Sequence, residues 1–259
     1  MRWKIGCYSG VPQVNLHDVQ IIVETYRHDG MYWAECEISD DVVFSMIFPF
    51  ARALASFLED HRELWLGRIL RQQFHYLSAG ERLWVLGRAL QILSRGETNQ
   101  DTERIDRMTI TLMLFMSEHH TVIVEGVQDF LLPDVREELL SVLGQAADDY
   151  FLEHEHREYI QFLRVFSERQ HSRAAAVHIR YGDLVMTDDK GELVGQELIE
   201  CLRDGLPPDN DDKELQDELL VSALVTLAPS QIVLHGNFPH AFGHMLRDIF
   251  PGRVLSNVP

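Results

Sequence analysis

The hydrophobic pattern changes in the last third of this chain, and that change constrains the fold more than any other feature. Three short apolar runs, 175–180, 184–187 and 192–194, are separated by two turns that contain glycine and aspartate. Glycine and aspartate tolerate the backbone angles of tight turns, so this segment predicts a three-stranded β-meander.

The residues after the meander predict a different kind of unit. An acidic, proline-containing loop at 202–212 precedes a helix that ends at Pro229, and the apolar run 232–234 predicts a buried strand. Pro239 suits the first turn of a helix, and residues 253–256 predict a last strand. A strand–helix–strand unit normally crosses over into parallel pairing, so we expect a mixed sheet.

The amino-terminal two thirds predict a hairpin followed by helices. Residues 19–26 and 31–38 flank Asp29-Gly30, a strong hairpin signal because both turn residues tolerate positive φ. From about residue 42 to 170 the pattern is helical. Ser78 and Glu81 are spaced as a capping box, and residues 135–170 predict one long helix or two abutting ones.

A polar run at 94–102 has no apolar anchor and predicts a linker. It separates an amino-terminal region of hairpin and helices, 1–96, from a second region, 101–259. The predicted fold class is α+β, with an amino-terminal β-hairpin, a mostly helical middle and a small mixed α/β carboxyl-terminal lobe.

Composition weighs against several classes of function. The net charge is −18 and the chain has no cluster of Lys and Arg, so we expect no nucleic-acid binding and a protein partner that is basic if charged. The longest apolar stretch, 42–58, contains Pro49 and Arg52, which predicts no membrane span. Three isolated cysteines and a start without a long apolar core predict a cytoplasmic protein with reduced thiols.

One candidate site follows the predicted strand at 231–235. His240 and His244 are spaced i, i+4 on a predicted helix and can share a divalent metal such as zinc, with His235 as a third ligand. Ligands in α/β sheets bind beyond the carboxyl ends of strands, so His235, Gly236 and Asn237 are candidate ligand-binding residues. The alternative is structural, since asparagine caps helices and glycine forms turns.

No sequence pattern identifies a reaction. The segment from His240 to His244 lacks the glutamate of zinc proteases, and the chain has neither a nucleophile elbow nor a glycine-rich phosphate loop. In the acidic run 153–156, only His154 has an i, i+4 partner, Glu158, so a solvated helical face is the simpler interpretation. We therefore predict no cofactor and no catalytic residues.

Aromatic residues recur at helical spacing later in the same predicted helix, at Phe151, Tyr159, Phe162 and Phe166, with Leu163 among them. This spacing favours an intramolecular core, and we expect Phe162 and Phe166 to be buried. If part of the set were exposed, aromatic residues beside Arg164 and Arg169 would be typical of a partner surface.

Several of these segments resemble a known family. The clearest pieces are Glu125-Gly126, the helix end at 159–170, Val177-His178 with the following hairpin, and residues 222–235. Together they resemble the YtxC-like sporulation proteins of spore-forming bacteria over residues 121–254. The resemblance implies a cytoplasmic protein connected with sporulation and brings no catalytic residue.

These observations predict a non-enzymatic cytoplasmic factor connected with sporulation that acts through protein–protein contacts. The alternative is a metal-dependent or anion-binding enzyme with its site at the end of the strand at 231–235.

Overall fold

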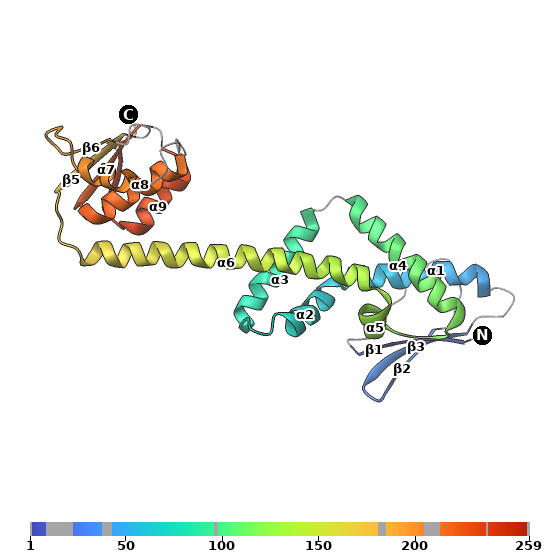
Figure 1. Ribbon diagram of the computed structural model, residues 1–259. Coiled ribbons are helices and arrows are strands. Elements are labelled where there is room, and N and C mark those ends of the chain that lie inside the picture. Colours follow the sequence, from blue (N-terminus) through green and yellow to red (C-terminus); the bar gives the residue numbers. More distant parts are fainter. Residues whose placement is uncertain are drawn as a thin grey trace. The chain divides into compact units, whose positions relative to one another are not determined.

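The computed structural model describes residues 2–8, 23–37, 43–95, 98–180, 185–204, 213–236 and 238–257. The chain divides into two compact units, unit 1 (Met1–Phe151) and unit 2 (Leu152–Pro259), and most of their elements are labelled in Figure 1. Each unit combines a small sheet with helices, which confirms the α+β fold class. The predicted division into 1–96 and 101–259 stays a prediction.

Unit 1 contains a four-stranded sheet in the order β2-β3-β1-β4. Its strands are β1 (Arg2–Cys7), β2 (Val23–His28), β3 (Met31–Glu37) and β4 (Thr121–Ile123). The predicted hairpin is confirmed, because β2 pairs antiparallel with β3 and the turn residues Asp29 and Gly30 adopt φ of 50° and 79°. β1 extends the sheet by pairing antiparallel with β3 and parallel with β4.

The helices of unit 1 follow the predicted helical pattern, except that strand β4 interrupts the region predicted to be helical over 42–170, where the prediction is wrong. These helices are α1 (Val43–Asp60), α2 (Arg62–Gln73), α3 (Ala79–Arg95), α4 (Thr98–Glu118), α5 (Val124–Gly126), the π-helix η2 (Val127–Leu131) and the first part of α6 (Pro133–Arg169). The capping box is confirmed, since Ser78 and Glu81 each donate a backbone N–H to the side chain of the other. Residues 135–169 form one helix, not two.

The predicted linker at 94–102 is wrong in its extent. α3 continues through Arg95 and α4 already begins at Thr98. The polar residues that suggested a linker form the first turn of α4. Helix starts favour polar side chains because the first backbone N–H groups have no partner within the helix.

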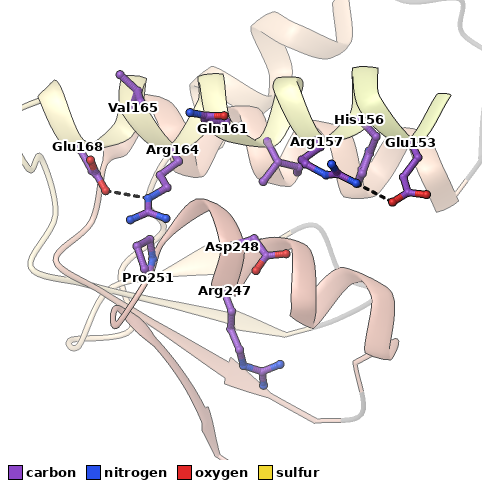
Figure 2. Close-up of a pocket in the computed structure, with 11 residues that line it drawn as sticks. Glu153, His156, Arg157, Gln161, Arg164, Val165, Glu168, Arg247, Asp248 and Pro251 are labelled. Carbon is purple, nitrogen blue, oxygen red and sulfur yellow. Dashed lines mark hydrogen bonds and ion pairs between the residues drawn. The ribbon is translucent and has the colours of Figure 1, made fainter. Parts of the chain in front are cut away.

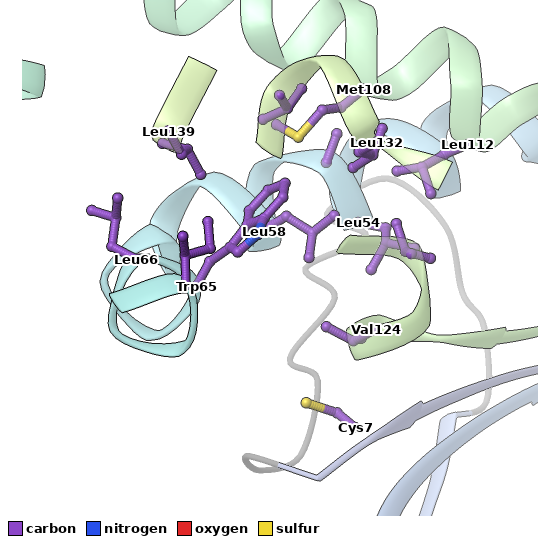
Figure 3. Packing of buried hydrophobic residues seen from close by; sticks show 14 of the residues in the cluster. Cys7, Leu54, Leu58, Trp65, Leu66, Met108, Leu112, Val124, Leu132 and Leu139 are labelled. Carbon is purple, nitrogen blue, oxygen red and sulfur yellow. The ribbon is translucent and has the colours of Figure 1, made fainter. Parts of the chain in front are cut away.

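The core of unit 1 joins the helices to the sheet (Figure 3). It contains Cys7 of β1 and Val124 of α5, and its helical part is formed by Leu54, Leu58, Trp65, Leu66, Met108, Leu112, Leu132 and Leu139. The first part of α6 contributes one continuous buried face, formed by Val135, Leu139, Leu143, Ala146 and Ala147. This part of α6 is therefore a core helix.

A buried arginine joins three helices of unit 1. Arg104 of α4 is 2% exposed, and its guanidinium donates to Glu59 at 2.7 Å, to Asp101 at 3.2 Å and to Glu138 of α6 at 2.7 Å. Burial acts to lower the pKa of Arg104, but the hydrogen bond to Glu138 and the charges of the three carboxylates outweigh it and raise that pKa above its ordinary value. The charge is thus compensated inside the protein.

Unit 2 contains a second four-stranded sheet, in the order β6-β5-β7-β8. Its strands are β5 (Ala176–Arg180), β6 (Val185–Thr187), β7 (Gln231–His235) and β8 (Val254–Asn257). β6 is antiparallel to β5, whereas β5, β7 and β8 are parallel to one another. The predicted strand–helix–strand unit, β7 to β8, is confirmed.

The third strand of the predicted meander is wrong. Only an isolated bridge between Thr187 and Leu193 forms at residues 192–194. Gly195, with φ of 75°, turns the chain directly into α7, so the run is too short to extend the sheet. The predicted turn at 181–183 lies outside the described residues.

The helices of unit 2 are α7 (Gln196–Asp204), α8 (Lys213–Leu227), α9 (His240–Ile249) and the last part of α6. The prediction of a loop at 202–212 is wrong for residues 202–204, which belong to α7, and its remaining residues lie outside the described part of the chain. Val177 and Ile179 of β5 and the matching residues of β7 form a core with α8 and α9. Side chains that alternate with them, among them His178 and His235, lie on the other face of the sheet and are only partly buried.

None of the helices in the described part of the chain combines the length and the apolarity that crossing a membrane requires.

Candidate functional site

At the predicted strand-end site, the side chain of His235 lies beside that of His178. His235 is the last residue of β7, and its Nε2 lies 2.8 Å from Nδ1 of His178 on the parallel strand β5. Nε2 of His178 lies 3.0 Å from Oδ1 of Asp189, in the turn after β6. The three side chains form a hydrogen-bonded chain in which the Asp189 carboxylate accepts from His178, and the imidazoles of His178 and His235 share a hydrogen bond.

The other predicted residues of this site do not join that chain. Gly236 follows β7 with φ of 93°, which fits a turn that favours glycine, and Asn237 lies outside the described residues. His240 and His244 are both exposed on α9, one helical turn apart. Among the described residues, no group of three or more His, Cys, Asp or Glu side chains is placed to hold a metal ion. The zinc site at His235, His240 and His244 therefore stays a prediction.

Sequence reasoning missed Asp189 as a neighbour of His178. The signal that could have found it is the strand register, because Thr187 of β6 lies opposite His178 and Asp189 follows two residues later. Predicting that register requires knowing that β6 pairs with β5.

The last part of α6 packs against the rest of unit 2 through few residues. Leu163 and Ser167 are buried and Ile160 is half-buried, and these residues lie on one side of the helix. His154 and Glu158 make the expected i, i+4 contact, at 3.7 Å. Most other side chains of this part of the helix are exposed.

The aromatic residues of α6 lie on that exposed surface. Tyr159 is 50% exposed, Phe162 64% and Phe166 45%. The expectation that Phe162 and Phe166 are buried is therefore wrong, whereas Leu163 between them is buried. The reason is that the apolar residues of this part of α6 occupy a wider strip of the helix surface than the neighbouring elements of unit 2 can cover. The residues outside the covered part stay exposed.

These aromatic residues form a regular pattern with a leucine. Leu152, Tyr159, Phe162 and Phe166 are separated by seven, three and four residues, which is the spacing of the a and d positions of helix–helix seams. Leu152 is also exposed. We call these four residues the α6 stripe. Its acidic flank comprises Glu155 and Glu158, both exposed.

A polar groove of about 780 Å³ lies between α6 and α9 (Figure 2). On α6, Arg157 pairs with Glu153 at 2.7 Å and Arg164 pairs with Glu168 at 3.0 Å. Arg164 points toward α9, whereas Arg247 of α9 extends away from α6 and donates to Ser256 at 2.8 Å. Because these cations are already paired or point apart, the groove does not gather them into one site.

A comparison with protein-family models matches residues 50–255 of the chain to the YtxC-like family. The chain belongs to the YtxC-like family. The match starts well before residue 121, so family membership extends into helices α1 to α4, beyond the segments in which the sequence resemblance was found. It contains the α6 stripe as well as His178, Asp189 and His235. No curated protein and no solved structure matches the chain.

Proposed function

We propose that this YtxC-like protein is a non-enzymatic cytoplasmic factor connected with sporulation, and that it acts through protein contacts made by the α6 stripe. The observation that carries the proposal is the exposure of Tyr159, Phe162 and Phe166 on one helical face. Aromatic residues are enriched at the centres of protein interfaces. The resemblance to sporulation proteins supports the biological context.

The partner that fits this surface is a protein helix with an apolar face and a basic flank. Seam spacing of the stripe residues suits a helix laid alongside α6, because side chains at a and d positions insert between those of the facing helix. Two glutamates, Glu155 and Glu158, lie within the same segment, and the whole chain carries a net charge of −18. A basic flank would therefore be attracted over a distance that shortens as salt rises.

Site-specific photo-crosslinking in sporulating cells tests this proposal. A photoreactive amino acid replaces Phe162 in one variant and Leu83 in a matched control, since Leu83 is 70% exposed on α3 in unit 1. The proposal expects a discrete crosslinked protein from position 162 that is absent from position 83 and lost when Tyr159 and Phe166 are changed to Ser.

Two results would speak against the proposal. One is the same crosslinked products from both positions, which indicates nonspecific contact. The other is no product from position 162 at any stage of sporulation. A product whose mass equals two copies of the chain would identify self-association in place of a basic partner.

A further inference from the structure

A second cavity lies within unit 1, away from every residue that the sequence singled out as a site. Its volume is about 340 Å³, within the range of small-ligand pockets. One wall is a face of α2 on which Leu64, Arg68 and Arg71 follow one another at helical spacing. Val124 of α5 and Gln128 of the π-helix η2 also line it.

The cavity has apolar lining residues from α1, α2 and α5. Phe57, Leu58, Leu64 and Val124 contribute hydrophobic side chains. The ring of His61 is fixed here, because its Nδ1 lies 2.9 Å from the carbonyl oxygen of Phe57 and its ring lies 4.2 Å from the Phe57 ring. These groups offer a preformed surface to the apolar body of a ligand.

Gln128 contributes a side-chain amide to the lining of the cavity. It is only 7% exposed, yet none of the hydrogen bonds within the described residues uses its side-chain amide. Its amide atoms are not themselves fully buried, so the amide reaches the open space of the cavity and is accessible to a ligand. Gln128 lies in a π-helix, an irregularity that is frequent at functional sites.

Two arginines supply positive charge beside Gln128. Nη2 of Arg68 donates to Asp129 at 2.6 Å, while its Nη1 is buried without a hydrogen-bond partner. Arg71 is exposed and takes part in none of the ion pairs found among the described residues. Glu125 also lines the cavity, where it accepts the backbone N–H of Tyr8 at 2.8 Å.

The charged residues at the cavity indicate how much charge a ligand can carry. Asp129 pairs with Nη2 of Arg68 only, so Nη1 of Arg68 and the guanidinium of Arg71 can hold one anionic group, whereas the carboxylates of Asp129 and Glu125 disfavour a ligand with more than one negative charge. From this balance we infer that the cavity binds a small amphiphilic monocarboxylate. Its carboxylate accepts hydrogen bonds from Arg71 and Gln128, and its apolar body lies against Leu64 and Val124.

Calorimetric titration of the full chain with octanoate and phenylacetate tests this inference. Octanol and phenylethanol serve as neutral counterparts of matched shape. The inference expects at least one carboxylate to bind saturably with a Kd below about 1 mM, a modest affinity for so few atoms. It expects the matching alcohol to bind about tenfold more weakly or worse, because charge-assisted hydrogen bonds are the stronger ones.

Variants locate the binding. Arg71→Gln should weaken carboxylate binding about tenfold, whereas Arg95→Gln, at an exposed arginine on α3, should leave it unchanged. Gln128→Leu should weaken binding because it removes an amide that lines the cavity, and the melting temperature of the variant shows whether it is folded.

Three results would overturn the inference. They are the absence of saturable binding by both carboxylates, equal binding of acid and alcohol, and unchanged affinity in Arg71→Gln and Gln128→Leu together.

Discussion

The two parts of α6 have the same kind of apolar pattern and opposite surroundings. In unit 1, Leu139 and Leu143 lie in the core with almost no exposed surface. In unit 2, Phe162 is 64% and Phe166 45% exposed, although they too recur at helical spacing. The comparison teaches that periodicity identifies an amphipathic helix but does not identify what covers its apolar face.

The two units also differ in how they bury charge. Arg104 of unit 1 is surrounded by three carboxylates, Glu59, Asp101 and Glu138, the last of which belongs to α6. In unit 2, burial raises the pKa of Asp217 on α8 above its ordinary value. Unit 1 thus compensates its buried charge, whereas the carboxylate of Asp217 lowers the stability of unit 2 when it is ionised.

The largest effect is expected in the buried part of α6. Leu143→Ala should lower the free energy of unfolding by about 2–5 kcal/mol, because it leaves a cavity in a closed core. All four tryptophans lie in unit 1, so tryptophan fluorescence in a denaturant melt reports this unit specifically. A loss below about 1 kcal/mol would mean that this part of α6 is not a core helix.

The next effect concerns the buried charge of unit 1. Arg104→Met keeps much of the side-chain volume but leaves Glu59 and Glu138 without their shared donor. We expect a loss of about 1–3 kcal/mol, the cost of leaving buried polar groups unsatisfied. The same fluorescence melt measures it, and Arg107→Met, at an exposed arginine that also contacts Glu138, is the control. Equal losses in the two variants would contradict the role given to burial.

At Asp217 we expect a smaller effect, and one that stabilises the protein. A carboxyl whose pKa is raised on folding binds its proton more tightly in the folded state, so stability falls as pH rises from the ordinary aspartate pKa through the raised value. Asp217→Asn should therefore raise the melting temperature at neutral pH. The gain should vanish below the ordinary aspartate pKa, as circular dichroism melts at a series of pH values can establish. A variant less stable than the parent at neutral pH would refute this assignment.

The smallest effect is expected in the exposed part of α6. Phe162→Ala should change the free energy of unfolding by no more than about 0.5 kcal/mol, as is usual for surface substitutions. Leu163→Ala, one residue later and buried, should destabilise unit 2 clearly and is the matched control. Urea melts followed by circular dichroism compare the two, and equal losses would place Phe162 in the core.

Local sequence signals predicted much of the fold. The Asp29-Gly30 hairpin and the Ser78–Glu81 capping box depend on residues a few positions apart, and both are confirmed. β1 was not predicted, because its pairing with Thr121 and its neighbours in β4 joins segments more than a hundred residues apart. Nothing local distinguishes such a strand from a loop.

The candidate site was likewise predictable only where it depends on residues that are close in the sequence. The position of His235 at a strand end followed from the local pattern. Its pairing with His178 and Asp189 required the order of strands in the sheet. The cavity at Arg71 and Gln128 is assembled from elements of α1, α2, α5, η2 and β1, so no sequence window contains it.

Hydroxyl-radical footprinting of the purified, dilute chain tests the central claim most directly. Mass spectrometry compares the oxidation rates of individual aromatic side chains. The account predicts that Phe162 and Phe166 react about as fast as the exposed Phe130, and much faster than the buried Phe50 and Phe250. Rates at Phe162 and Phe166 as low as those of Phe50 and Phe250, at every protein concentration, would contradict it by showing that the chain covers its own stripe.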